Sequence, residues 1–431
     1  MSTVFASFWI YQLIYLPFVF ALGAIVGSFL NVVIYRMPAG LSVVSPPSSC
    51  PRCGHRLRWH ENLPIVGWLR LGGKCSQCRQ PISIQYPLVE LLCALFFTLT
   101  FVLYYMVLPT APVIGGLVPA YLERQGFVQT WPMWALHLIM FMALLAMSVI
   151  DARTYTVPIQ LTWVVTISAF LVHALMPIWP GGHLSLPLEW HGRLAQEYPG
   201  GPSLYPGGPV AHMWDFSHWT IPLVGPVGFG VGVGALLGIG VSTLLLRANL
   251  LRVSFLDFDF YVGQSESIIA YPHARREVEW ELDYLSPILL GMIAGGLIGL
   301  HFSAAQLPLW AASLGGSIQG YLVGAGIIWA TRIIFTLLFG KEAMGLGDAH
   351  ILGCVGAVLG WIDPILIFFA SPFFALAGVA ATLLLRSLFK GSTRVLPFGP
   401  WLAVGTLAIV YGDRWVEPFL GHMFRVWVFL P

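Results

Sequence analysis

The chain has 431 residues, of which 57% are hydrophobic and only 9% carry a charged side chain, and its mean hydropathy is +0.79. This composition excludes a soluble globular protein and indicates a polytopic membrane protein, for which the lipid bilayer is the first expected partner. The formal net charge of +2 gives no indication of nucleic-acid binding, and we expect none.

The apolar runs predict an all-α fold with about 8–10 transmembrane helices. The first run is too long for the apolar part of a signal peptide and lacks a cleavage site of small residues, so we expect it to remain as the first span. The eighth is short enough to be half-buried or re-entrant. The candidate spans lie near residues 10–36, 87–109, 133–151, 158–177, 221–246, 285–304, 308–338, 348–362, 364–387 and 396–412.

The distribution of basic residues predicts the orientation. If the N-terminus lies outside, the inner regions carry sixteen Lys and Arg residues and the outer regions carry four, while Arg332 lies within a span. Cytoplasmic loops carry the excess of basic residues in membrane proteins, so the loop 37–86 is predicted to be cytoplasmic. The inner loop 247–284 ends in a mixed-charge stretch and is predicted to be a solvated surface. The Gly- and Pro-rich segment 178–220 is predicted to be an irregular external loop.

Four of the six cysteines form two pairs with the spacing of metal ligands. Two residues separate Cys50 from Cys53 and Cys75 from Cys78, and 21 residues lie between the pairs. Two such pairs complete a tetrahedral site with four sulfur ligands, the arrangement typical of structural zinc. Because no position remains for a catalytic water, we expect the metal to stabilise a small loop that lacks a sufficient core of its own.

A redox role for the two cysteine pairs is the main alternative, although a reducing cytoplasmic compartment disfavours it. His55 and His60 are further candidate ligands. The remaining cysteines, Cys93 and Cys354, lie inside apolar runs and are expected to be ordinary buried thiols.

Two aspartates stand at the ends of apolar runs, both at the predicted cytoplasmic face. Asp151 closes one run, and Asp348 directly follows a turn that contains Gly345 and Gly347. A carboxylate next to the membrane is costly unless it is paired or faces water. The two glycines allow a close backbone approach or an unusual turn. If the two acids meet, they could share one proton and activate a water molecule, which is the chemistry of an aspartic protease.

Roles outside proteolysis also fit these acids. Asp151 could be an interfacial anchor or the partner of Arg153. Both aspartates could serve an ion- or proton-coupled transporter, although the acids of such carriers usually lie near the middle of the membrane. A non-catalytic scaffold that docks partners through the cysteine module is a third hypothesis. Glu90, at another predicted cytoplasmic span end, could orient a catalytic group, bind a cationic part of a substrate, or be an interfacial acid.

Together these motifs resemble those of the type IV prepilin peptidases, bacterial leader peptidases that process type IV pilins and type II secretion pseudopilins. The resemblance covers roughly residues 20–175 and 308–412. The motifs that carry it, in chain order, are Gly27-Ser28-Phe29-Leu30-Asn31-Val32-Val33-Ile34-Tyr35-Arg36, Cys50-Pro51-x-Cys53, Asn62-Leu63-Pro64, Gly73-Lys74-Cys75-x2-Cys78, Tyr86-Pro87-x-Val89-Glu90, Asp151 with Val157-Pro158, Gly340-Lys341-Glu342-Ala343-Met344-Gly345-Leu346-Gly347-Asp348, and Pro397-Phe398-Gly399-Pro400.

The resemblance implies a membrane aspartic endopeptidase of the GxGD type in the bacterial cytoplasmic (inner) membrane, with Asp151 and Asp348 as the catalytic pair and Gly345, Gly347 and Glu90 as supporting residues. Its substrates would be prepilins or pseudopilins, cut after a short basic leader at the cytoplasmic face. Members with the cysteine module often also methylate the new N-terminus with S-adenosylmethionine. The sequence contains no glycine-rich nucleotide fingerprint, so this second activity rests on the resemblance alone and its cofactor-binding residues are unknown.

The family usually has eight spans, so the region 178–307 would insert two more. Arg153 and His350 also depart from the residues common at their positions, but both aspartates are retained. The expected organisation is a first transmembrane helix in 1–36, the cytoplasmic zinc module in 37–86, transmembrane helices with the first aspartate in 87–177, the insertion in 178–307, transmembrane helices with the GxGD motif in 308–412, and a tail in 413–431.

Overall fold

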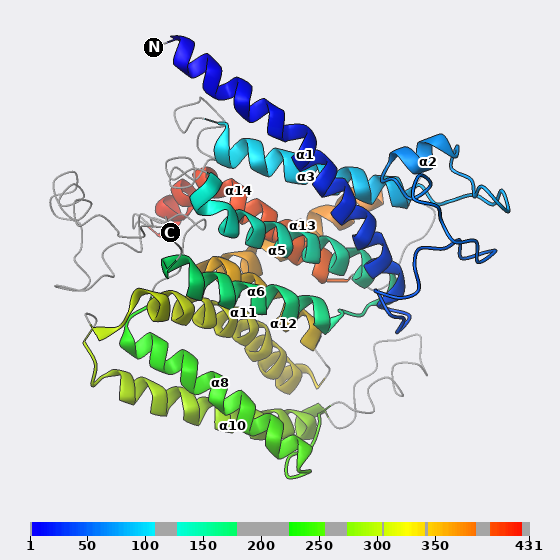
Figure 1. Ribbon diagram of the computed structural model, residues 1–431. Helices are drawn as coiled ribbons and strands as arrows, with labels where there is room; N and C mark the ends of the chain where they lie inside the picture. Colours follow the sequence, from blue (N-terminus) through cyan, green and yellow to red (C-terminus); the bar gives the residue numbers. More distant parts are fainter. Residues whose placement is uncertain are drawn as a thin grey trace. The chain divides into compact units, whose positions relative to one another are not determined.

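The structure is a computed structural model that describes residues 2–107, 127–178, 224–254, 274–303, 306–340, 344–384 and 397–424. The predicted external loop 178–220, apart from its first residue, and the part of the predicted tail 413–431 beyond residue 424 lie outside the described residues. The chain divides into two compact units, Met1–Pro158 and Ile159–Pro431. In Figure 1 the long elements of the described part are all helices, and only the region around the short α2 is mostly loop, which confirms the all-α prediction.

Each unit contains several long apolar helices. Those of the first unit are α1 (Ser2–Arg36), α3 (Gln85–Tyr105) and α5 (Phe127–Thr154), with the short α2 (Val66–Arg70). Those of the second unit are α6 (Ile159–Leu175), followed by the 3₁₀ turn η2 (Met176–Ile178), then α8 (Pro226–Arg247), α10 (Ala274–Gly299), α11 (Leu309–Phe339), α12 (Leu346–Leu359), α13 (Ile362–Leu384) and α14 (Gly399–Phe424).

Among the described residues, eight helices are long and apolar enough to cross a membrane. Two shorter apolar helices, α12 and the segment Gly399–Gly412 of α14, account for the other predicted spans. The predicted range of about 8–10 spans is therefore confirmed. The eighth apolar run is short, as expected, because α12 has only 14 residues.

Helices α1 and α3 pack closely because glycines of α1 face the backbone of α3 (Figure 1). A Cβ at Gly27 would lie 2.7 Å from the Cα of Glu90, and Gly23, one turn earlier, is equally crowded. Small residues four positions apart allow membrane helices to approach in this way. Asn31 adds a polar contact, because its Nδ2 donates to the carbonyl of Tyr86 at 3.0 Å. The motif around Gly27 is thus a helix-packing surface.

In the second unit, α8 and α10 also lie side by side through glycine contacts, and α8 packs on α11 (Figure 1). A Cβ on Gly234 of α8 would overlap the carbonyl of Gly291 on α10, and a Cβ on Gly291 would overlap the carbonyl of Gly234. Close backbone contact of this kind favours van der Waals packing between helices in a lipid environment. The two helices of the predicted insertion therefore form a tightly packed pair that also contacts the rest of the unit.

The mixed-charge stretch before residue 284 differs from the prediction. Helix α10 begins at Ala274, so this stretch is the first part of a helix. Glu277 and Glu281 are buried, with 4% and 2% of their surface exposed. The prediction of a solvated surface is therefore wrong for these two acids. The physical reason for Glu281 is an ion pair with Arg332 of α11, at 3.0 Å, which makes burial of its charge tolerable.

Candidate functional site

The two cysteine pairs of the first unit occupy two turns of the same design. In the first, the amide of Gly54 donates to the carbonyl of Cys50 at 2.9 Å; in the second, the amide of Arg79 donates to the carbonyl of Cys75 at 3.0 Å. The residue after the second cysteine of each pair has a positive φ, 71° at Gly54 and 58° at Arg79. This left-handed residue reverses the chain, so that both sulfurs of a pair point to the same side.

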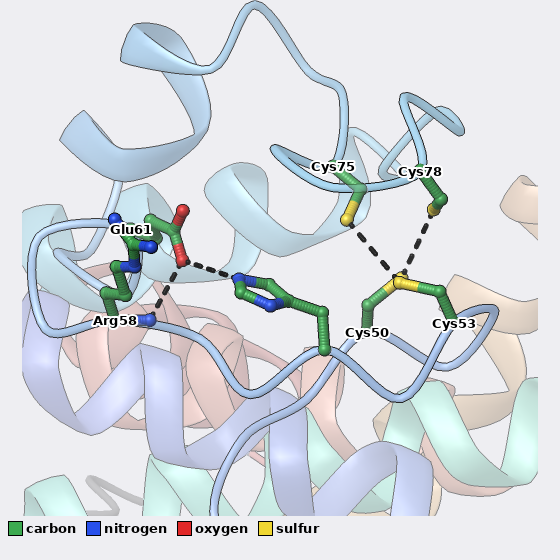
Figure 2. Close-up of polar contacts among 7 residues, drawn as sticks. Cys50, Cys53, Arg58, Glu61, Cys75 and Cys78 are labelled. Carbon is green, nitrogen blue, oxygen red and sulfur yellow. Dashed lines mark hydrogen bonds and ion pairs between the residues drawn. The ribbon is translucent and has the colours of Figure 1, made fainter.

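The four sulfurs face one another, as Figure 2 shows. The Sγ atoms of Cys50 and Cys78 are 3.9 Å apart, those of Cys53 and Cys75 are 4.0 Å apart, and all four lie within 4.8 Å of one another. A tetrahedral ion with metal–sulfur bonds of about 2.3 Å requires sulfurs about 3.8 Å apart. The donor set and its spacing therefore fit a metal ion with four thiolate ligands, as the sequence predicts.

Backbone amides and the neighbouring sulfurs control the charge of these thiols. Burial opposes ionisation of Cys50, but the amides of Cys53 and Arg52 outweigh it and lower its pKa to about 7. The amide of His55 also favours the thiolate of Cys53, yet burial and the other sulfurs raise the pKa of Cys53 to about 11. A bound divalent cation would neutralise this crowding of negative charge, because metal ligation requires the deprotonated thiols.

The candidate ligand His55 faces an acid. Its Nε2 lies 3.3 Å from Oε2 of Glu61, which also accepts the backbone amide of Arg58 at 2.9 Å (Figure 2). The amide of Arg58, the side chain of Ser76 and His55 together lower the pKa of Glu61 to about 2. In the described structure His55 therefore stabilises the loop next to the sulfurs, and the group that could hold a metal consists of the four cysteines.

Glu90 connects the cysteine module to the membrane helix α3. Its side chain is buried, and its Oε2 accepts the backbone amide of Ile65 at 2.6 Å. Ile65 directly precedes α2 and has a φ of 61°, which is costly for a β-branched residue. The Glu90 contact helps to hold this turn against α3. The role predicted for Glu90 at a catalytic centre stays a prediction.

Asp151 lies in the last turn of α5 and is buried, with 6% of its surface exposed. Its neighbour Arg153 donates from Nη2 to the side-chain oxygen of Gln85 at the start of α3. The end of α5 is thus fixed to the beginning of α3 within the first unit.

Asp348 lies in the first turn of α12 and is half-buried. Its amide donates to the carbonyl of Gly345 at 3.3 Å. Gly345 has φ −74° and ψ 143°, which any residue can adopt, so the expected unusual backbone is absent at this position. A Cβ at Gly345 would instead lie 3.8 Å from Oδ2 of Asp348. The glycine therefore leaves space beside the carboxylate.

Asp151 belongs to the first compact unit and Asp348 to the second, and their meeting stays a prediction. The structure adds one charged group that the motifs did not include. Arg332 is buried in α11, pairs with Glu281 and donates from Nη1 to the carbonyl of Met344 at 2.7 Å, immediately before the glycine turn. A single arginine inside an apolar run was the signal in the sequence, since charges in membrane spans usually have a dedicated partner.

Comparison with known proteins gives consistent similarities. Residues 21–104 match the family model of the bacterial Peptidase A24 N-terminal domain. Prepilin leader peptidase/N-methyltransferase of Myxococcus xanthus is 59% identical over 80 residues, which are 19% of this chain and 24% of that relative. The protein of the same name from Pseudomonas aeruginosa is 27% identical over 424 residues, covering 93% of this chain and 91% of the relative. No solved structure matches.

The region matched by the family model includes the second half of α1, the cysteine module and most of α3, so it falls on the first unit. The longer similarity covers 93% of this chain and therefore extends into the second unit. With the eight apolar helices found among its described residues, the chain is a multi-pass inner-membrane protein. The predicted resemblance is confirmed: residues 21–104 match the bacterial Peptidase A24 N-terminal domain, and the chain is similar along most of its length to prepilin leader peptidases/N-methyltransferases.

Proposed function

We propose that this chain is a membrane aspartic endopeptidase that removes the leader peptide of type IV prepilins or type II secretion pseudopilins and then methylates the new N-terminus. The similarity along 93% of the chain to a prepilin leader peptidase/N-methyltransferase carries the proposal. The transporter alternative is not favoured, because the similar proteins are named for peptidase and methyltransferase activities. Both proposed catalytic acids lie at helix ends, whereas the acids of proton-coupled carriers usually lie near the middle of a span.

The proposed chemistry needs one ionised and one protonated aspartate. The ionised carboxylate takes a proton from a water molecule, whose oxygen attacks the scissile carbonyl carbon, while the protonated carboxyl donates to the carbonyl oxygen. The C–N bond then breaks and the leaving amine takes up a proton. Like charges at short distance disfavour ionisation of both acids, so the pair holds one proton.

The positions of the two acids suggest which one is ionised. Asp348 lies in the first turn of α12, where the peptide dipoles favour a negative charge. Asp151 is buried in the last turn of α5, where the dipoles disfavour it. We therefore assign Asp348 as the base and Asp151 as the proton donor. Gly345 supports this role by leaving the Asp348 carboxylate accessible, and we assign Gly347 the same role.

We further propose that the four-cysteine group binds one structural zinc ion. Four thiolates at this spacing suit zinc, which prefers closed tetrahedral sulfur sites in structural modules. The bound ion would cross-link the two turns and leave no open position for a substrate. Glu90 then attaches the zinc loop to the membrane helix α3 through the amide of Ile65.

The excess of basic residues supports an orientation with the N-terminus outside and the cysteine module in the cytoplasm. In that orientation the prepilin or pseudopilin presents its basic leader on the cytoplasmic side. Its apolar helix would pack between the spans. The methyl donor would be S-adenosylmethionine, and the residues that bind it are unknown.

Mass spectrometry of a prepilin incubated with the purified membrane protein, with and without S-adenosylmethionine, tests both activities. We expect loss of the leader in both reactions and a gain of one methyl group only with the donor. Cleavage without methylation in the presence of the donor would refute the second activity. Unchanged substrates across several prepilins and pseudopilins would refute the first.

A further inference from the structure

Arg332 is a charged side chain placed deep within an apolar helix. It is the only charged residue in the sequence of α11, which runs for 31 residues, and it is 1% exposed. Burying a guanidinium in this setting is costly unless its charge and its N–H groups are satisfied. The contacts of Arg332 therefore indicate the structural role of this residue.

The first partner is Glu281 on α10, one helix of the predicted insertion. Arg332 donates from Nε to Oε1 of Glu281 at 3.0 Å, and both side chains are 2% exposed. The carboxylate also accepts Trp329 Nε1 at 3.0 Å, on Oε2, and the hydroxyl of Ser254 at 3.3 Å, on Oε1. Both oxygens of the Glu281 carboxylate thus accept hydrogen bonds, and the carboxylate orients the guanidinium of Arg332.

The second partner lies beside the glycine turn. Nη1 of Arg332 donates to the backbone carbonyl of Met344 at 2.7 Å, and Met344 directly precedes Gly345. A charge-assisted hydrogen bond of this length is among the stronger contacts available to a backbone carbonyl. Gly345 has no side chain to anchor the turn, so the Met344 carbonyl is a natural point of attachment. Asp348 follows within the first turn of α12.

We propose that Glu281 and Arg332 are positioning residues for the glycine turn: Glu281 orients Arg332, and Arg332 holds the Met344 carbonyl and thereby places Asp348. The proposal rests on the proposed function of Asp348 as a catalytic residue. It gives the pair α8–α10 a role in the reaction, because Glu281 comes from α10. Neither residue is expected to touch the substrate.

The chemical reason is the sensitivity of catalysis to placement. A shift of about 1 Å in a catalytic group can reduce the rate about 100-fold. A positioning contact affects the chemical step and not the binding of the substrate. Its loss should therefore lower kcat and leave KM nearly unchanged. A pair that only stabilises the fold would change neither value in a variant that remains folded.

The decisive variant removes the contact without leaving a buried charge. In Glu281→Gln/Arg332→Met both charges disappear together, and the glutamine still offers an acceptor to Trp329. Arg332→Lys is the second variant, because it keeps a cation opposite Glu281 but lacks the planar group that reaches both partners. The matched control is Ser242→Ala, which removes a 2.6 Å hydrogen bond from α8 to the carbonyl of Tyr284 on α10 and leaves Arg332 untouched.

Two measurements are made on the full-length protein in detergent: prepilin cleavage kinetics and amide hydrogen exchange over residues 344–348. We expect the double variant to lose about 10- to 100-fold in kcat with KM within about twofold of wild type, and its turn amides to exchange faster. Ser242→Ala should match the wild type in both measurements. Wild-type kcat in the double variant, or a lower kcat with unchanged exchange at the turn, would overturn the proposal.

The two proposals can fail separately. If the double variant does not fold, Arg332→Lys tests the positioning role in its place. A wild-type kcat in Arg332→Lys overturns that role. If the wild-type protein cleaves no prepilin, the proposed function fails. The exchange measurement, which needs no substrate, then still shows whether the Glu281–Arg332 pair holds the turn.

Discussion

Substitution of Gly27 by alanine tests the packing of α1 against α3. The new Cβ would lie 2.7 Å from the Cα of Glu90, whereas ordinary van der Waals contact begins at 3.4 Å. The nearest atom belongs to the backbone and cannot rotate away, so the helices must separate by about 0.7 Å or accept the overlap. Overpacking of this kind costs about 1–3 kcal/mol.

Separation of the two helices would also move Glu90. Its Oε2 is only 2.6 Å from the amide of Ile65, so a displacement of α3 weakens the contact that holds the cysteine module. We therefore expect Gly27→Ala to lower the unfolding temperature and to increase proteolysis of the loop 37–86 together. The assays are thermal unfolding in detergent and limited digestion followed by mass spectrometry.

Gly240→Ala on α8 is the control. A Cβ at Gly240 would meet no atom within 4 Å, so the substitution only removes the flexibility of a helical glycine. It should be neutral or stabilise the protein by up to about 1 kcal/mol. The packing argument is refuted if Gly27→Ala is as stable as the wild type, or if both substitutions destabilise equally.

Three further predictions concern the site. Asp151→Asn and Asp348→Asn should each lower cleavage at least about 100-fold while protein levels stay unchanged, because each removes a proton-transfer group; near-normal cleavage by either would contradict the pair. Metal analysis of purified protein should give about one zinc per chain, and Cys75→Ser should lower that content and expose the loop to protease; a metal-free, protease-resistant loop would contradict a structural ion. Because folding lowers the pKa of Glu61 to about 2, its contribution to stability is present above the unfolded value of 4.5 and is lost as the pH falls toward 2. Stability measured from pH 2 to 7 should therefore depend less on pH in Glu61→Gln than in the wild type, and equal slopes would refute the assignment.

Local patterns in the sequence predicted the features that depend on neighbouring residues. The spacing of Cys50 and Cys53 determines a turn that brings two sulfurs to one side, so the metal group could be expected from the spacing of the pairs. The length of each apolar run determines whether a helix can cross the membrane, so the approximate number of spans could be predicted from the sequence. Asp151 and Asp348 were visible because an acid next to an apolar run stands out in a chain of which only 9% of the residues are charged.

Contacts between distant segments could not be derived in this way. Glu281 and Arg332 are 51 residues apart, and the acid lies in a stretch whose charges suggested a solvated surface. Glu90 and Ile65 are 25 residues apart, and their contact depends on how the loop returns to α3. Sequence patterns alone therefore determined that this is a helical membrane protein with a four-cysteine module and two aspartates at the ends of apolar runs. Only the tertiary structure decided which buried charges neutralise each other, because a single acid can find its partner on any helix that packs against it.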